Sequence, residues 1–484
     1  MHEEVLTYTR RELMQAVFSG AALPVPPVCI RIDLWYQDAV SRGALPEEWS
    51  GDTVAGIEDR LGFCRSARWR ARPRLVFPGN TVKEADQGDQ HITRYDFPGA
   101  ALEKVEQRTV EQARAGMRGT IVRYPVSDEA SCRALLKALE NARLEADLKG
   151  FADFDRETGD AGLPLLILGS CPAHALMLDW FGYQNFFYAL ADYPEKLSEL
   201  ISALETIYRR DLWEKALRTP AELIMHGNHF ADTTTPPPLF RRFFLPYFQQ
   251  FNARVHEAGK KVLWHADAEM GTLMELVLEA GFNGADCLAT APLVKQTMAD
   301  YDQVWRGRIV SWGGLPGTLF NPEVPESEFL EHVRSVQEFT RDRPGCIIGA
   351  SDNVMPGACW KRIKILSDQL LNPVPIPLKN AGGFRRRGRS RPGQRSDNIE
   401  IAPAAFVAIR REPRPVGHLI LARRVGGKLV TRAIQHPIMH LLAGFVVSVG
   451  EWFEDGRRDH AVVSLLAAAS RFITASAMLA PALR

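Results

Sequence analysis

The sequence lacks the features that mark a secreted or a nucleic-acid-binding protein. Its seven cysteines include no CxxC pair, which argues for reduced thiols in a cytoplasmic protein and against a disulfide framework. The formal net charge is only +1, so the chain carries no general signal for binding nucleic acid or an anionic membrane. Acidic residues near the N-terminus and the lack of a long apolar run there argue against a signal peptide. We therefore expect a cytoplasmic globular protein.

Long apolar runs of the kind that span a membrane are also missing. The stretch 437–450 is too short to cross a bilayer, and Arg471 and several polar residues interrupt the stretch 461–483. Six arginines between residues 385 and 395 lie in a Pro- and Gly-rich segment that is typical of a linker. We expect neither a membrane nor a nucleic-acid partner.

The sequence does contain eight short apolar runs, most of them separated by segments with helical periodicity. Continuous runs of this kind indicate strands that are buried on both faces, as in a parallel sheet. Eight strands alternating with helices predict an α/β fold, a TIM (β/α)8 barrel. An open doubly wound sheet would give a similar pattern, but no GxGxxG motif follows the first run. The eight runs are residues 25–33, 119–126, 164–170, 222–228, 261–267, 284–290, 309–315 and 346–352.

The predicted domain boundaries lie where this pattern stops. Residues 1–372 are predicted to form the barrel, with the long stretch 34–118 after the first strand as an insertion near the barrel mouth. Residues 373–400 form a Pro/Gly/Arg-rich linker. Residues 401–484 show no pattern that would complete the barrel. We interpret them as an irregular C-terminal extension that is either non-native or disordered.

Polar residues follow the apolar runs, at the positions where a barrel carries its active site. His265 and Asp267 are two residues apart, so an extended strand places both on one face, and Asp352 follows the eighth run. One imidazole and two carboxylates suit a divalent ion such as zinc, iron or manganese. In the alternative interpretation, Asp267 caps the following helix and His265 donates to a backbone carbonyl. The other candidates at these strand ends are Arg31, Asp33, Tyr124, His226, Asn228 and Glu269.

Two of these candidates allow more than one interpretation. The Arg31 guanidinium can clamp a substrate carboxylate through two hydrogen bonds, or it can form a salt bridge with Asp33 at the barrel rim. His226 is suited equally to a ligand role and to hydrogen bonding within its loop. The residue types alone leave both questions open.

Longer segments resemble the uroporphyrinogen decarboxylase superfamily, whose members are TIM barrels. The resemblance covers roughly residues 8–370. It is clearest in "LILGSCPAHALMLDWFGYQNFFYALADYPEKLSELI", in "TPPPLFRRFFLPYFQQFNARVHEAGKKVLWHADAEM" and in "ASDNVMP". It implies the barrel fold, and the motifs are specific for the superfamily without being specific for one reaction.

Within the superfamily, the chain resembles most the corrinoid-dependent methyltransferases and O-demethylase components. Their zinc members use an HxC pair on the fifth strand and a later cysteine. His265 occupies the histidine position, and Asp267 and Asp352 occupy the two cysteine positions. The resemblance therefore implies a divalent metal, zinc in the first place, and methyl transfer between a small-molecule substrate and a corrinoid that a partner protein carries. In this interpretation, we assign catalysis to Glu269 and Tyr124, and substrate binding to Arg31, Asp33, His226 and Asn228.

Two other functions are compatible with the sequence. A cofactor-free decarboxylase of porphyrin biosynthesis would use Arg31 for the substrate carboxylate and Asp352 near the reacting ring. The chain has "IRIDLWY" where true uroporphyrinogen decarboxylases have "RQAGR", lacks their "FSDI" motif, and has Asp352 at the histidine of their "GHGI". The second alternative is a non-catalytic binding barrel, in which alanine at His265 would leave function intact.

Overall fold

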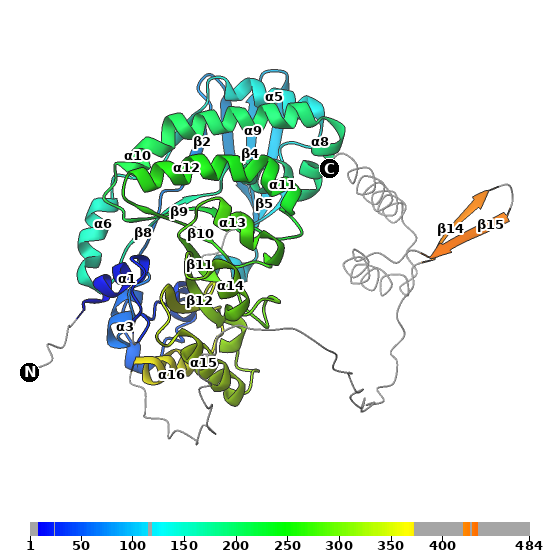
Figure 1. The fold of residues 1–484 in the computed structure, drawn as a ribbon. Helices are drawn as coiled ribbons and strands as arrows, with labels where there is room; N and C mark the ends of the chain where they lie inside the picture. The colour runs from blue at the N-terminus through cyan, green and yellow to red at the C-terminus, as the bar shows by residue number, and fades with distance from the viewer. Residues whose placement is uncertain (1–7, 24, 115–118, 372–419, 426–427, 434–484) are drawn as a thin grey trace, which may run out of the picture. The chain divides into compact units, whose positions relative to one another are not determined.

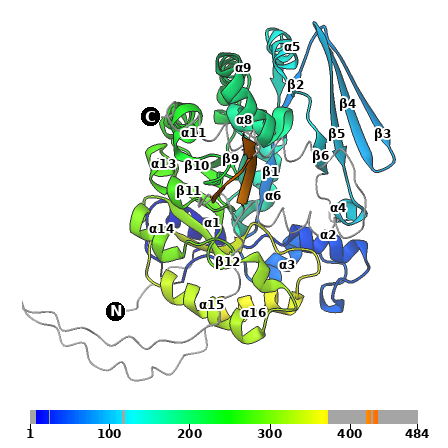
Figure 2. The same ribbon diagram turned by 90° about the vertical axis from the view of Figure 1, so that its right-hand side faces the viewer.

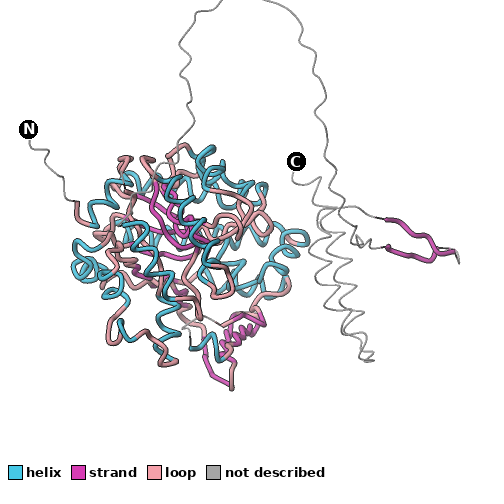
Figure 3. Tube along the Cα trace, turned by 90° about the horizontal axis from the view of Figure 1, so that it is seen from below, coloured by secondary structure: helices cyan, strands magenta, loops and turns pink. Residues whose placement is uncertain are grey.

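The computed structural model describes residues 8–23, 25–114, 119–371, 420–425 and 428–433. Its centre is a curled, seven-stranded parallel sheet of order β1-β8-β9-β10-β11-β12-β13, with helices around it (Figure 1, Figure 3). The strands are β1 (Arg68–Arg70), β8 (Leu165–Gly169), β9 (Leu223–Asn228), β10 (Lys261–His265), β11 (Gly284–Leu288), β12 (Val310–Pro316) and β13 (Cys346–Ser351).

The two edges of this sheet are connected through the extended segment 27–32. Val28 forms a parallel bridge with Ile348 of β13, and the Cys29 N–H donates to the Ile348 carbonyl at 2.8 Å. The Cys64 N–H, shortly before β1, donates to the Val28 carbonyl at 2.8 Å. Pro26 and Pro27 precede the bridge and have no N–H to donate, which limits the pairing of this segment. Of the predicted eight-stranded barrel, the structure thus shows seven strands and one bridged segment.

The prediction that residues 119–126 form the second barrel strand is wrong. β6 (Thr120–Arg123) pairs antiparallel with β5 (Ala100–Gln107), whereas the parallel neighbour of β8 is β1. β1 carries Arg68 and Arg70 at positions where a buried strand usually has hydrophobic residues. Its sequence therefore contains no apolar run that would predict a strand. The insertion therefore follows β1 and not the first apolar run.

The insertion is a four-stranded antiparallel sheet of order β3-β4-β5-β6, which lies to one side of the parallel sheet (Figure 2). Phe97 of β4 (Gln90–Phe97) and Leu102 of β5 are buried and join the same apolar cluster as Leu135 of α5 (Glu129–Leu139). The packing of these side chains attaches the insertion to the rest of the fold. Its remaining strands are β3 (Thr81–Gln87) and β4 (Gln90–Phe97), and a separate antiparallel pair consists of β2 (Arg74–Val76) and β7 (Arg143–Glu145).

The helices cover the outside of the parallel sheet (Figure 3). Several begin at clear capping signals; at α1, for example, Thr9 accepts from the Glu12 N–H, and the Glu12 carboxylate accepts from the Thr9 N–H. The α-helices are α1 (Arg10–Phe18), α2 (Asp33–Ser41), α3 (Val54–Arg60), α4 (Val110–Arg114), α5 (Glu129–Leu139), α6 (Phe151–Thr158), α7 (Pro172–Ala175), α8 (Gly182–Asp192), α9 (Pro194–Tyr208), α10 (Glu214–Leu217), α11 (Pro237–Leu239), α12 (Leu245–Glu257), α13 (Met274–Glu279), α14 (Met298–Trp305), α15 (Glu326–Thr340) and α16 (Trp360–Leu371). Shorter 3-10 or π segments are η1 (Glu47–Trp49), η2 (Gly159–Ala161), η3 (Leu176–Phe181), η4 (Arg209–Trp213), η5 (Phe240–Phe244), η6 (Gly271–Leu273) and η7 (Gly317–Phe320).

Inside the curled sheet, an apolar floor lies below a polar layer. Alternate residues of a strand share a face, and the inward residues near the strand starts are hydrophobic. Further along the same strands, the inward positions hold charged and polar groups, among them His265 and Asp286. The polar side chains at the C-terminal strand ends therefore lie over a closed apolar layer. The floor consists of Leu165, Leu223, Leu263, Val310 and Ile347, together with Met14, Val17 and Phe18 of α1.

The described part of the second compact unit is an antiparallel hairpin of β14 (Ile420–Val425) and β15 (Lys428–Ala433). The predicted linker 373–400 lies outside the described residues, as does most of the predicted extension 401–484. The linker and the extension therefore both stay predictions. Among the described residues, no helix combines the length and the apolar character that crossing a bilayer requires.

Glu58 of α3 makes the stability of the fold depend on pH. The residue is only 3% exposed, and burial raises the pKa of its carboxyl to about 8, although the Ser66 N–H donates to it. The folded chain therefore keeps this proton at pH values where an unfolded glutamic acid, with a usual pKa of 4.5, has released it. Between these two values, rising pH favours unfolding by about 1.4 kcal/mol per pH unit.

We expect Glu58→Gln to remove this pH dependence. Relative to the variant, the wild-type chain loses stability as pH rises from about 5 to 8, and the difference is constant above that range. Unfolding midpoints in urea across the pH range measure the effect. Glu331→Gln, which neutralises an exposed carboxylate of α15, is the matched control. Identical pH profiles for wild type and Glu58→Gln would contradict the prediction.

Candidate metal centre

His265, at the end of β10, is the centre of a buried polar cluster. Its Nδ1 lies 3.1 Å from Asp286 Oδ2, and its Nε2 lies 3.3 Å from Asp352 Oδ1 and 3.4 Å from Asp267 Oδ2. Burial by itself opposes a charged ring, but Cys287 and the three carboxylates raise the pKa of His265 well above its usual value. Three carboxylates thus converge on one imidazole that is 7% exposed.

Asp286 orients His265 and is itself held by Arg68. It is fully buried in β11, and Arg68 donates to its two oxygens from Nη1 at 2.9 Å and from Nη2 at 2.6 Å. Burial alone would raise the pKa of Asp286, yet Arg68 and His265 lower it below its usual range. The carboxylate on Nδ1 leaves Nε2 directed toward the other two acids. Metal-binding histidines are commonly held in this way by a carboxylate on the opposite ring nitrogen.

Two groups of potential metal ligands share His265. One group is His265, Cys287 and Asp352, and the other is His229, His265 and Asp267. Within each group, the ligand atoms lie within 4.8 Å of one another. The site is a candidate metal centre. The trio predicted from the sequence is divided, because Asp267 and Asp352 approach the same nitrogen of His265 but belong to different groups.

Cys287 is a candidate ligand to which no pattern in the sequence points directly. Its Sγ donates to the backbone oxygen of Asp352 at 3.2 Å and lies 3.8 Å from a guanidinium nitrogen of both Arg31 and Arg68. The sulfur thus lies between the backbone of Asp352 and two guanidiniums, inside the cluster around His265. The residue sits in an apolar run that predicts only a buried strand. The adjacent Asp286 was the available signal, since a charge inside such a run requires a buried partner.

The backbone is unusual at the same residues. His229, Cys287 and Asp352 have φ angles of 54°, 56° and 62°, and they are three of the six described non-glycine residues with positive φ. This conformation is costly for a residue with a Cβ and persists where the surroundings enforce it, often at functional sites. Each of the three belongs to one of the two ligand groups.

Arg31 lies at the rim and holds Asp352. Its Nη1 donates to Asp352 Oδ1 at 2.8 Å, and its Nε lies 3.5 Å from Asp33 Oδ1. Asp33 accepts a second contact from Asn353 Nδ2 at 2.8 Å. Burial opposes charge on Asp352, but His265 and Arg31 lower the pKa of its carboxyl. The salt bridge considered for Arg31 is therefore present, with Asp352 as the closer partner.

Asp267 and Glu269 have different surroundings, although both follow β10. The two carboxylate oxygens of Asp267 lie 2.7 and 2.9 Å from His229 Nδ1. Glu269 Oε2 accepts from the Lys295 backbone N–H at 3.0 Å. The carboxylate of Glu269 thus contacts the loop before α14, and its catalytic role stays a prediction.

His226 lies in the apolar core with both ring nitrogens engaged. Nδ1 is 3.0 Å from the Gly169 carbonyl oxygen, and Nε2 is 2.8 Å from the Tyr247 hydroxyl. Burial lowers its pKa to about 4, so the ring is neutral near pH 7. Its two partners belong to β8 and α12 and not to the loop that follows β9, so hydrogen bonding within that loop is not what the structure shows. Asn228 is half-buried and accepts from Ser170 Oγ at 3.0 Å, and its substrate role stays a prediction.

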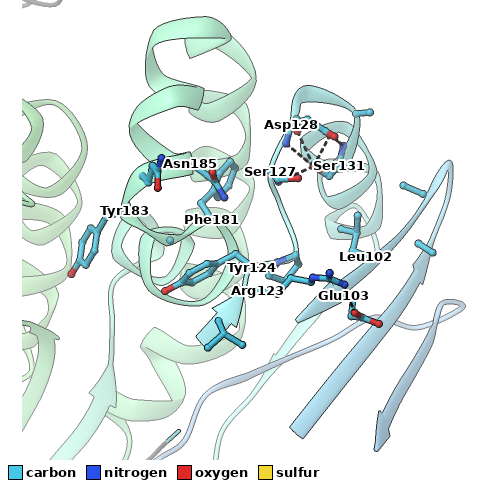
Figure 4. Close-up of a pocket in the computed structure, with 17 residues that line it drawn as sticks. Leu102, Glu103, Arg123, Tyr124, Ser127, Asp128, Ser131, Phe181, Tyr183 and Asn185 are labelled. Carbon is cyan, nitrogen blue, oxygen red and sulfur yellow. Dashed lines mark hydrogen bonds and ion pairs between the residues drawn. The ribbon is translucent and has the colours of Figure 1, made fainter. Parts of the chain in front are cut away.

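Tyr124 lines a cavity of about 820 Å³ between the insertion and α8, and Figure 4 shows its ring between Arg123 and Tyr183. The ring packs on Gly182, where a Cβ would lie 2.5 Å from it. Arg123 is paired with Glu103 of β5 at 2.6 Å. The lining of this cavity includes no member of the two ligand groups, so a catalytic role of Tyr124 at the metal stays a prediction.

No family model and no curated protein sequence matches this chain. Among solved structures, it is similar to a methyltransferase from Methanosarcina mazei, with a TM-score of 0.46 and 11% identity over 75% of this chain and 100% of that chain. It is also similar to a fungal endo-beta-N-acetylglucosaminidase of glycosyl hydrolase family 18, with a TM-score of 0.27 and 12% identity over 53% of this chain and 84% of that chain. A third similar structure is a mutant PTE-like lactonase from Deinococcus radiodurans. Its TM-score is 0.26 and its identity 15%, over 43% of this chain and 59% of that chain. At these scores and identities, the likeness assigns neither a family nor an activity.

Proposed function

We propose that this chain is a metal-assisted enzyme that transfers a methyl group between a small-molecule substrate and a corrinoid carried by a partner protein. The observation that carries the metal assignment is the orientation of His265, whose Nδ1 is bound to buried Asp286 while Nε2 faces Asp352. The methyl-transfer part is supported by the sequence segments that resemble corrinoid-dependent methyltransferases.

The donor set fits zinc. His265, Cys287 and Asp352 offer an imidazole, a sulfur and a carboxylate, which are the three ligand types found at zinc sites. Three protein ligands leave a further position for substrate, as in catalytic zinc centres. With Cys287 the set is softer than the one imidazole and two carboxylates predicted from the sequence, and this change favours zinc over manganese.

The surrounding residues have defined roles in this proposal. Arg68 and Asp286 hold the His265 ring, and Arg31 holds Asp352. When bound, a divalent ion supplies Lewis acidity toward the oxygen or sulfur atom that gains or loses the methyl group. The cofactor-free decarboxylase needs Arg31 for a substrate carboxylate, and here that side chain is already paired with Asp352. A non-catalytic barrel needs no such ordered donor set.

The proposal is tested by removing the metal from the purified full chain with a chelator and then returning zinc. Free methylcobalamin stands in for the corrinoid protein, and small thiols and phenols serve as methyl acceptors. In each turnover, the methyl group passes from cobalt to the deprotonated acceptor, and both electrons of the cobalt–carbon bond remain on cobalt. We expect the absorbance change of methylcobalamin to stop in the metal-free chain and to return with zinc. Turnover that is unaffected by chelation, or absent in every zinc-loaded sample, would contradict the proposal.

A further inference from the structure

β1 places two arginines inside the curled sheet. Arg68 pairs in register with Leu165 of β8, and Arg70 pairs with Ile167. Leu165 and Ile167 both belong to the interior apolar cluster. Laterally paired residues of neighbouring parallel strands project from the same face of the sheet, so both arginines face the interior. Arg70 is the one nearer to the C-terminal strand ends, where the metal ligands lie.

The carboxylates around the mouth already have partners. Arg68 holds Asp286, and Arg31 holds Asp352. The other two are Asp267, which contacts His229, and Asp33, which contacts Asn353. Among the described residues, none of these four carboxylates forms an ion pair with Arg70.

Arg70 differs from Arg31 and Arg68, which are both paired with carboxylates. Within the described residues, it has no hydrogen-bond or ion-pair partner, and the residue is exposed at the mouth of the curled sheet. Partial burial and the charges of Arg31 and Arg68 lower the pKa of Arg70, whereas Asp33 and Asp352 act in the opposite direction. A guanidinium next to two others, without a counter-ion of its own, attracts an anion from solution.

We propose that Arg70, beside Arg31, binds the carboxylate of a small organic substrate at the mouth of the curled sheet. A guanidinium presents two parallel N–H donors, which match the two oxygens of a carboxylate. Asp33 and Asp352 lie near enough to influence Arg70, so they repel a doubly charged phosphate more than a singly charged carboxylate. The inference names the substrate class of the proposed metal enzyme, and in this respect it rests on the proposed function.

The test measures, by calorimetry, how tightly benzoate and its uncharged analogue benzamide bind to the metal-free full chain. Without metal, a carboxylate cannot bind through the ion, so the signal reports the arginines. We expect saturable benzoate binding, about tenfold tighter than benzamide, and a loss of about tenfold in Arg70→Gln. Arg70→Lys keeps the charge but loses the two parallel N–H donors, so its benzoate affinity is expected to lie between those of the wild type and Arg70→Gln. Arg341→Gln removes an exposed arginine elsewhere and is expected to bind as the wild type does.

Several outcomes would overturn the inference. These are equal binding of benzoate and benzamide, unchanged binding in Arg70→Gln, no saturable binding by the wild type, or Arg70-dependent binding of inorganic phosphate that exceeds benzoate binding. Because Arg70 is exposed and has no partner in the part of the chain that the structure describes, we expect Arg70→Gln to keep the wild-type unfolding midpoint and zinc content. Loss of zinc binding with benzoate binding intact would count against the metal centre alone. Zinc binding without Arg70-dependent benzoate binding would overturn only this inference.

Discussion

Replacing Asp286 with alanine is expected to lower the free energy of unfolding by about 3–5 kcal/mol. The substitution leaves the Arg68 guanidinium, whose side chain is 8% exposed, without its two-oxygen partner. It also removes the acceptor of His265 Nδ1. The cost comes mainly from an uncompensated buried charge and not from the loss of the attraction itself. Urea unfolding of the full chain, followed by tryptophan fluorescence, measures the change.

The same reasoning predicts a partial rescue. In Arg68→Met combined with Asp286→Ala, the buried charge is gone, so the double variant is expected to be more stable than Asp286→Ala alone. Glu129→Ala is the matched control, since Glu129 forms an exposed ion pair with Arg133 and its loss is expected to cost about 0.5 kcal/mol or less. If Asp286→Ala unfolds at the wild-type midpoint, the buried pair does not stabilise the site as described.

Replacing Cys287 with alanine is expected to weaken zinc binding by more than about 100-fold. Loss of a residue that only holds a metal ligand in place already costs roughly 10–100-fold in affinity, and loss of the ligand itself costs more. The reason is that Cys287 contributes a ligand atom to the group that also contains His265 and Asp352. Competition with a chromophoric chelator measures the dissociation constant. Cys346→Ala, which removes another buried thiol from β13, is expected to leave zinc affinity unchanged.

Asp267→Ala separates the two ligand groups. If zinc binds to His265, Cys287 and Asp352, this variant loses much less affinity than Cys287→Ala. The reverse order would assign the ion to the group of His229, His265 and Asp267, and it would contradict the donor set proposed here. Unchanged zinc affinity in both variants would contradict metal binding at either group.

Part of the site could be predicted because strand ends in a parallel α/β fold converge. This rule selected His265, Asp267 and Asp352 from their positions after apolar runs, and the structure places both carboxylates within 3.4 Å of the His265 ring. The same rule also selected His226, which the structure places among aromatic side chains with both nitrogens engaged. A position in sequence does not say which face of a strand end a side chain occupies.

The strand β1 could not be predicted, for a physical reason. Apolar runs indicate buried strands because burial usually requires hydrophobic side chains. β1 is three residues long, and the guanidinium of Arg68 is tolerated inside because Asp286 of β11 neutralises it. That partner lies 218 residues away in sequence. Residues 119–126 carry the apolar run that β1 lacks, but they belong to the antiparallel insertion, where β6 pairs with β5.

By itself, the sequence determined the alternation of strands and helices, the apolar runs of six of the seven parallel strands, and a histidine with carboxylates at their ends. These features follow from local periodicity and from hydrophobic patterns, which a chain carries along its length. Only the tertiary structure decided that Cys287 joins His265 and Asp352, that Asp286 fixes the imidazole, and that Arg70 has no ion-pair partner among the described residues. These are pairings between charges on different strands, and only folding brings such groups within hydrogen-bonding distance.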